Sequence, residues 1–171
     1  FNRTLVTRNL NDNFKILSVF SKSLLIPTSK SVAITSLQRA LLHSDLLDLL
    51  KSLSDNRTWI EKLFFEILFP CMLESSDTEM RQRLVGLSSK IFLQSLSNHL
   101  VPTENSDLFM AVWSRLLEMY HLYYRTSSTN ENDLVREAVA ESLKNLVLVL
   151  INLGILSKEN EQLWNEAWLK I

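Results

Sequence analysis

The sequence predicts an all-α fold in which antiparallel helix pairs stack as a right-handed α-solenoid of the HEAT or armadillo type. The 171 residues include only two glycines and three prolines, whereas sheet proteins need many such residues for their turns. Hydrophobic residues recur every three or four positions along most of the chain, which is the period of an amphipathic helix. The linkers are mostly short, so consecutive helices should be antiparallel neighbours. Helix pairs of about 40–47 residues have the size of HEAT or armadillo repeats.

Several segments have this helical period. They span residues 12–26, 29–43, 45–51, 58–73, 78–100, 106–125, 132–153 and 157–171. Pro27 ends the first segment, because proline has no backbone N–H to donate, and Thr28 or Ser29 caps the second. Pro70 should kink the fourth segment or end it early for the same reason.

The next helix has a start signal, a stop signal and an internal glycine. Asp77 or Thr78 is expected to cap it, and Pro102 is expected to close it. Gly86 costs about 1 kcal/mol relative to alanine in a helix interior. We therefore expect close contact with another helix to be the reason for this glycine.

The last two segments carry the strongest apolar faces. The face of the 132–153 segment consists of Val135, Val139, Leu143, Leu146 and Leu150. Its second half is apolar all round, which predicts the most buried element of the fold. Gly154 follows at the position that a C-terminal glycine occupies. The face of the 157–171 segment consists of Leu163, Trp164, Ala167, Trp168 and Ile171.

The organisation predicted is one helical repeat domain, residues 1–171, excised from a larger protein, because both ends look like cuts. The helix pairs should cover about residues 29–73, 78–125 and 132–171. The longest apolar run, Leu146–Ile151, is far shorter than the ~20 residues that span a bilayer.

The titratable and aromatic residues do not form a reactive set. Cys71 is the one cysteine and lies in an apolar stretch, which predicts a buried side chain and excludes an internal disulfide. His121 lies beside tyrosines, which favours a packing or interface role. The tryptophans Trp113, Trp164 and Trp168 are expected in the core, and a groove that shows some of them to a partner helix is the alternative. We predict no catalytic, cofactor or metal site.

The charge is distributed unevenly. Residues 1–44 carry six Lys or Arg and one acid, Asp12, which gives this segment a net charge of +5, although the net charge of the whole chain is −1. Lys15, Lys22 and Lys30 are the candidate patch that faces lipid or a partner; ordinary solvated lysines are the alternative. The sequence pI of about 6.4 argues against nucleic-acid binding.

Several short strings resemble the C-terminal region of the large Arf guanine-nucleotide exchange factors, in particular the Golgi GBF/Gea type. The strings are Leu37–Leu42, Leu68–Pro70, Ser89–Gln94, Glu137–Leu146 and Leu163–Ile171. They keep the order that the family has and span about residues 31–171. The Ser- and Asn-rich linkers look like those of the fungal Gea proteins.

The resemblance implies a cytoplasmic protein that associates peripherally with Golgi membranes and acts in vesicle transport. Its implied partners are an Arf or Rab-type small GTPase, other domains of the same protein, and Golgi lipids such as phosphoinositides, with no nucleic acid and no small-molecule substrate. The catalytic loop of the family is not in this chain, so the expected role is regulatory and membrane-targeting, without enzymatic activity. The alternative is a structural scaffold that makes only intramolecular or generic protein contacts.

Overall fold

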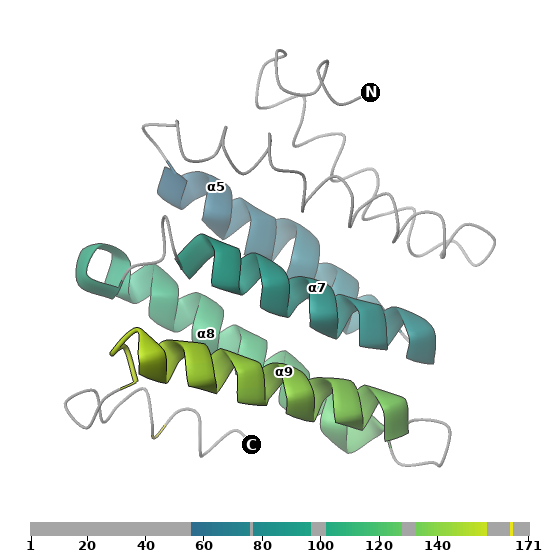
Figure 1. Cartoon of the computed structure of the whole chain (residues 1–171). Coiled ribbons are helices and arrows are strands. Elements are labelled where there is room, and N and C mark those ends of the chain that lie inside the picture. The colour runs from purple at the N-terminus through teal and green to yellow at the C-terminus, as the bar shows by residue number, and fades with distance from the viewer. Residues whose placement is uncertain (1–55, 76, 97–101, 128–132, 157–164, 166–171) are drawn as a thin grey trace, which may run out of the picture. The chain divides into compact units, whose positions relative to one another are not determined.

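A computed structural model describes residues 56–75, 77–96, 102–127, 133–156 and 165 (Figure 1). Every regular element in these residues is a helix and none is a strand, which confirms the all-α prediction. The chain divides into two compact units, Phe1–Ser75 and Ser76–Ile171. The predicted helices before residue 56 lie outside the described residues.

In the first unit, one helical run changes its winding ahead of a proline. The run consists of α5 (Asn56–Lys62), the π-helix η1 (Leu63–Leu68) and α6 (Phe69–Glu74). The Phe69 N–H donates to the carbonyl of Phe64, five residues back, as in a π-turn. Pro70 would clash with the carbonyl four residues before it in a regular α-helix. The wider turn accommodates the ring, so the helix continues to Glu74 and does not end early at Pro70.

The second unit contains three long helices, α7 (Thr78–Leu96), α8 (Pro102–Thr126) and α9 (Asp133–Asn152). Figure 1 shows α8 running antiparallel to both α7 and α9, so that α7 and α9 are parallel. Among these three helices, the most extensive backbone contact is between α7 and α9, although α8 lies between them in sequence. Aromatic rings lie between α7 and α8: the Phe92 centroid is 5.9 Å from that of Phe109 and 5.7 Å from that of Trp113.

Pro102 starts a helix. It is the first residue of α8, and the described part of α7 ends at Leu96. Proline is favoured at the first helical position, because the N–H that it lacks would have no partner within the helix there. The end of the preceding helix, expected near residue 100, lies outside the described residues, because residues 97–101 are not described.

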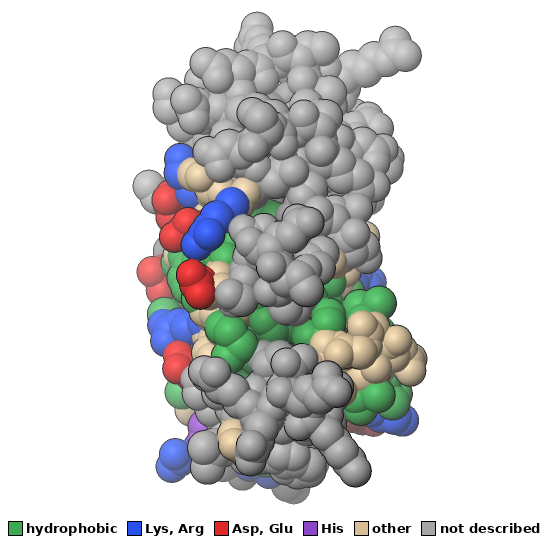
Figure 2. All heavy atoms as spheres, turned by 90° about the vertical axis from the view of Figure 1, so that its left-hand side faces the viewer, with side chains coloured by type: hydrophobic (Ala, Val, Ile, Leu, Met, Phe, Trp, Pro, Cys, Tyr) green, Lys and Arg blue, Asp and Glu red, His purple; other side chains and the backbone are tan. Residues whose placement is uncertain are grey.

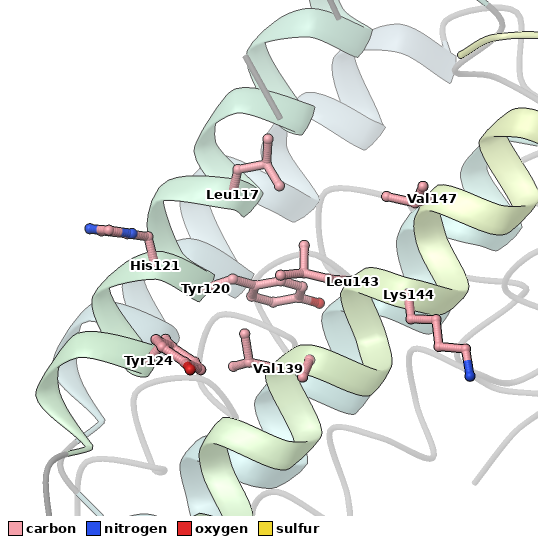
Figure 3. Close-up of a pocket in the computed structure, with 9 residues that line it drawn as sticks. Leu117, Tyr120, His121, Tyr124, Val139, Leu143, Lys144 and Val147 are labelled. Atoms are coloured by element: carbon pink, nitrogen blue, oxygen red, sulfur yellow. The ribbon is translucent and has the colours of Figure 1, made fainter. Parts of the chain in front are cut away.

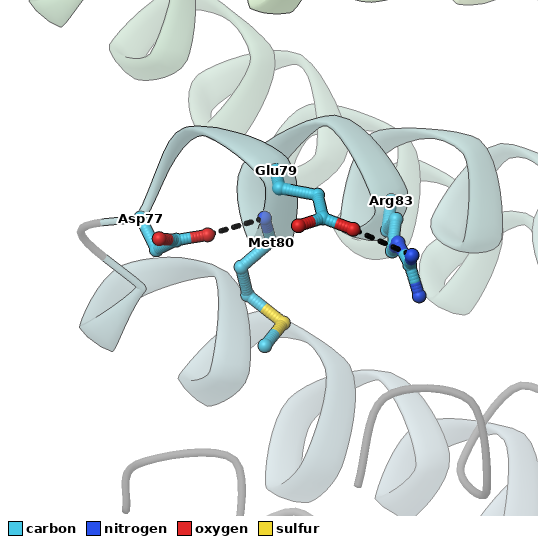
Figure 4. Close-up of polar contacts among 4 residues, drawn as sticks. All are labelled: Asp77, Glu79, Met80 and Arg83. Carbon is cyan, nitrogen blue, oxygen red and sulfur yellow. Dashed lines mark hydrogen bonds and ion pairs between the residues drawn. The ribbon is translucent and has the colours of Figure 1, made fainter. Parts of the chain in front are cut away.

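Asp77 is the residue that caps α7. Its Oδ1 accepts a hydrogen bond from the Met80 N–H at 2.9 Å (Figure 4), and its carbonyl accepts one from the Arg81 N–H. Of the two candidates that the sequence offered, the side chain of Asp77 thus satisfies a free N–H of the first turn. The same figure shows an ion pair between Glu79 and Arg83, which is largely exposed and contributes little to stability.

We expect the Asp77→Ala substitution to lower the free energy of unfolding by about 1 kcal/mol, since it removes the N-cap acceptor. Urea denaturation followed by far-ultraviolet circular dichroism measures this change. Asp77→Asn is the matched control, because asparagine keeps the acceptor oxygen. Equal losses in both variants would show that charge, and not the cap, is what matters.

The two glycines have different roles. Gly154 has φ +70°, and its N–H donates to the Ile151 carbonyl while the Ile155 N–H donates to the Leu150 carbonyl, each at 2.9 Å. This is a Schellman motif, which confirms the predicted C-terminal glycine. A methyl group added at Gly86 would have no heavy atom within 4 Å. The expectation that close helix contact requires Gly86 was therefore wrong.

Alanine substitutions at the two glycines should have opposite effects. Gly86→Ala should raise the free energy of unfolding by about 1 kcal/mol, because alanine favours the helix and has room there. Gly154→Ala should lower it by about 1 kcal/mol, because a Cβ disfavours positive φ. Paired urea melts measure both changes. A loss of stability in Gly86→Ala would show that the open space beside it is not available.

The sequence overestimated the burial of α9. Val135, Val139, Leu146 and Leu150 are buried as predicted, but Leu143 is only half-buried. Three apolar side chains near the end of α9 are exposed: Leu148, Ile151 and Leu153. Figure 2 looks onto the end of the molecule where α9 ends and shows hydrophobic side chains at the surface among charged ones. A helix that is apolar all round still buries only the sides that its neighbours reach.

Candidate interaction surface

A groove of about 430 Å³ lies between α8 and α9. We call it the α8–α9 groove; its lining residues are Leu117, Tyr120, His121, Tyr124, Val139, Ala140, Leu143, Lys144 and Val147 (Figure 3). On each helix these residues are spaced by one, three or four positions, so each helix turns one stripe toward the groove. The lining is apolar apart from His121, Lys144 and the tyrosine hydroxyls.

Tyr120 connects the groove to α7. Its ring lies between the two walls in Figure 3, and its hydroxyl donates to the Val85 carbonyl at 3.1 Å. The Ser88 hydroxyl is 3.1 Å from the Tyr120 hydroxyl and donates to the same carbonyl at 3.0 Å. Burial raises the pKa of the Tyr120 phenol well above its ordinary value of about 10, so it stays protonated. These bonds fix the ring, and thereby one groove wall.

Two arginines hold the C-terminal end of α8. Arg136 on α9 donates from Nε to the Tyr124 carbonyl at 3.1 Å, and its guanidinium lies 5.2 Å from the centroid of the Tyr124 ring. Arg81 on α7 donates to Thr126 Oγ1 at 3.0 Å and lies 5.0 Å from the centroid of the Tyr123 ring. Cations are favourable at a helix C-terminus and over aromatic faces. Arg136 on α9 therefore stabilises the position of Tyr124 at the groove edge.

The structure places some of the residues that the sequence singled out. Cys71 is buried in α6, and Trp113 is fully buried, as predicted. His121 lines the groove with its tyrosine neighbours, and Figure 3 shows its imidazole pointing away from the groove centre. The other residues that the sequence analysis singled out lie outside the described residues: Trp164, Trp168 and the basic patch of Lys15, Lys22 and Lys30.

Two kinds of feature are absent from the described part of the chain. No group of three or more His, Cys, Asp or Glu side chains there could hold a metal ion. Within the same residues, no helix combines the length and the apolar character that crossing a membrane requires.

Sequence analysis did not identify the α8–α9 groove. Ala140, Leu143, Val147 and Ile151 form a second apolar stripe on α9, beside the buried one. The sequence signal for it was the all-round apolarity of this helix, which we interpreted as deep burial. A second stripe on a helix with one buried face also indicates a surface for another helix.

Comparison with known proteins identifies the family. Residues 17–171 match the model of the GBF1-like, tetratrico peptide repeat region. The chain belongs to the GBF1-like family. This confirms the family resemblance carried by the short strings. The family description names tetratricopeptide repeats, whereas helix length had suggested HEAT or armadillo repeats. A tetratricopeptide repeat has ~34 residues, and α7 and α8, with 19 and 25 residues, together exceed that length.

One relative of this GBF1-like chain is the "Golgi-specific brefeldin A-resistance guanine nucleotide exchange factor 1 homolog" of Caenorhabditis elegans. The two are 30% identical over 132 residues, which is 74% of this chain and 6% of the relative. No solved structure matches the chain.

Proposed function

We propose that this chain is a regulatory and membrane-targeting region of an Arf-family guanine-nucleotide exchange factor, and that it acts by binding. The observation that carries the proposal is the GBF1-like family match over residues 17–171. The C. elegans relative is by name a Golgi-specific exchange factor, and this chain corresponds to a small part of it. In this proposal, nucleotide exchange belongs to another part of the protein.

The α8–α9 groove supports a binding role. Its lining holds one imidazole and one amine and is otherwise apolar or phenolic, with no carboxylate among the lining residues that the structure describes. Apolar grooves between helices are the type of surface that takes up another amphipathic helix. The proposed protein partners are an Arf or Rab-type small GTPase and other domains of the same protein.

We also propose that the protein associates peripherally with Golgi membranes through Lys15, Lys22 and Lys30. A basic residue near an anionic bilayer contributes roughly 1 kcal/mol, so these lysines alone bind weakly and protein contacts must add to them. The same proposal includes a single repeat domain over residues 1–171, with helix pairs at about 29–73, 78–125 and 132–171.

Vesicle sedimentation tests the membrane role. The chain should pellet with vesicles that contain phosphoinositides, and the Lys15→Glu/Lys22→Glu/Lys30→Glu variant should not. The matched control changes three other basic residues, Arg57, Lys90 and Arg125, which are exposed in the structure, to Glu and so alters the net charge equally. Equal pelleting of the wild type and the first variant would exclude the patch.

A nucleotide-release assay tests the non-catalytic role. The chain alone should not accelerate release of a fluorescent GDP analogue from an Arf GTPase. Acceleration by the isolated chain would show that exchange activity resides in it. Absence of any effect on exchange when the chain is removed from the full-length protein would favour the alternative of a structural scaffold.

A further inference from the structure

We propose that Thr126 is a phosphorylation site, and that Arg81 binds the phosphate and thereby holds the end of α8 against the start of α7. This inference goes beyond the binding role proposed above and does not depend on it. Among the serines and threonines whose burial the structure describes, Thr126 is the one that is exposed. It is also the last residue of α8. Helix ends fray readily, so this hydroxyl can enter the active site of a protein kinase.

A cation from another helix already contacts this hydroxyl. The antiparallel course of α7 and α8 brings the start of α7 beside the end of α8 (Figure 1). There Arg81 Nη1 donates to Thr126 Oγ1 at 3.0 Å, across 45 positions of the sequence. The guanidinium also lies 5.0 Å from the centroid of the Tyr123 ring, and this stacking restricts its orientation. A phosphate on Oγ1 would therefore meet a guanidinium that is already in place.

The charges around Thr126 determine what a phosphate would gain there. A phosphate adds a charge of about −1.5 to −2, and a guanidinium binds its oxygens in pairs, more strongly than it binds a neutral hydroxyl. Arg125 is exposed and adds a second cation. Asp77, one turn before Arg81, is an opposing charge whose Oδ1 accepts the Met80 N–H. The carbonyls at the end of α8 also oppose an anion, so the gain depends on Arg81.

The modification transfers the γ-phosphoryl group of ATP to the threonine. Thr126 Oγ1 attacks the γ-phosphorus, the bond to the ADP oxygen breaks, and the hydroxyl proton passes to a base of the kinase. In the unmodified chain the hydroxyl donates this proton to the Leu122 carbonyl at 2.8 Å. The phosphorylated side chain cannot make that bond. Phosphorylation thus exchanges a hydrogen bond within the last turn of α8 for bonds to α7.

Mass spectrometry tests the modification itself. The chain is incubated with ATP and a eukaryotic cytosolic extract, and trypsin then releases a peptide that contains Thr126 and ends at Arg136. Fragment ions should place a phosphate on Thr126, and the Thr126→Val variant should lose it. Phosphate confined to the other hydroxyls of this peptide, or no phosphate in it, would overturn the proposal.

Thermal unfolding tests the role of Arg81. The chain made with phosphothreonine at position 126 should melt about 2–4 °C higher than the unmodified chain. In an Arg81→Gln background the same phosphate should lower the melting temperature, because its cost at the helix C-terminus is then not offset. Lys90→Gln, at another exposed position of α7, is the matched control and should keep the rise. Equal effects of the phosphate in the wild type and in Arg81→Gln would show that Arg81 does not bind it.

Discussion

The substitution Trp113→Ala is expected to lower the free energy of unfolding by about 3–5 kcal/mol, the usual range for removing a fully buried aromatic side chain. Trp113 has no exposed surface, and its ring lies 5.7 Å from that of Phe92 on α7. The substitution would open a cavity in the aromatic layer between α7 and α8. Small domains have a total stability of about 5–15 kcal/mol, so this loss should appear in urea denaturation as a strongly lowered midpoint.

The variant Trp113→Phe separates the volume of this side chain from its polarity. The Trp113 Nε1–H is buried and has no hydrogen-bond partner among the described residues, and burying such a donor costs about 1–3 kcal/mol. Phenylalanine removes that cost and keeps a ring in the layer. We therefore expect a loss below about 1.5 kcal/mol. A loss as large as that of Trp113→Ala would mean that the indole N–H contributes to stability.

Tyr120 should make the second large contribution, at alkaline pH. Burial raises the phenol pKa in the folded protein, while the unfolded chain keeps a value of about 10. Below pH 10 the phenol is protonated in both states, and its contribution to stability is complete. As the pH rises above 10, the unfolded state gains stability by ionisation. The free energy of unfolding should then fall by up to about 1.4 kcal/mol per pH unit.

The comparison with Tyr120→Phe isolates this effect from other groups that titrate in the same range. Urea melts between pH 8 and pH 11 should show a smaller decline in the free energy of unfolding in the variant. The difference in slope against pH should approach the contribution of one titrating proton. At pH 8 the variant should be less stable than the wild type by about 1 kcal/mol, since it loses the hydrogen bond to the Val85 carbonyl. Parallel pH profiles in the two proteins would show that the phenol ionises freely in the folded state.

The sequence predicted local features well and proline effects less well. Asp77 and Gly154 were recognised because a cap depends on a few neighbouring residues. Pro70 and Pro102 were both expected to disrupt a helix. In the structure, a π-turn accommodates Pro70, and Pro102 is the first residue of α8. Each outcome depends on how the flanking turns are wound, and proline alone does not specify this.

The sequence by itself determined the helical class, the amphipathic segments and the family, because period, caps and short strings are properties of neighbouring residues. Only the tertiary structure decided which apolar residues are covered. Leu146 and Ile151 look alike in the sequence of α9, yet one is fully buried and the other is 42% exposed. The positions of the helices relative to one another also decide three other features. These are the contact between α7 and α9, the groove beside α8 and the open space at Gly86. Burial depends on where distant helices lie, and the apolar period of one helix carries no information about its neighbours.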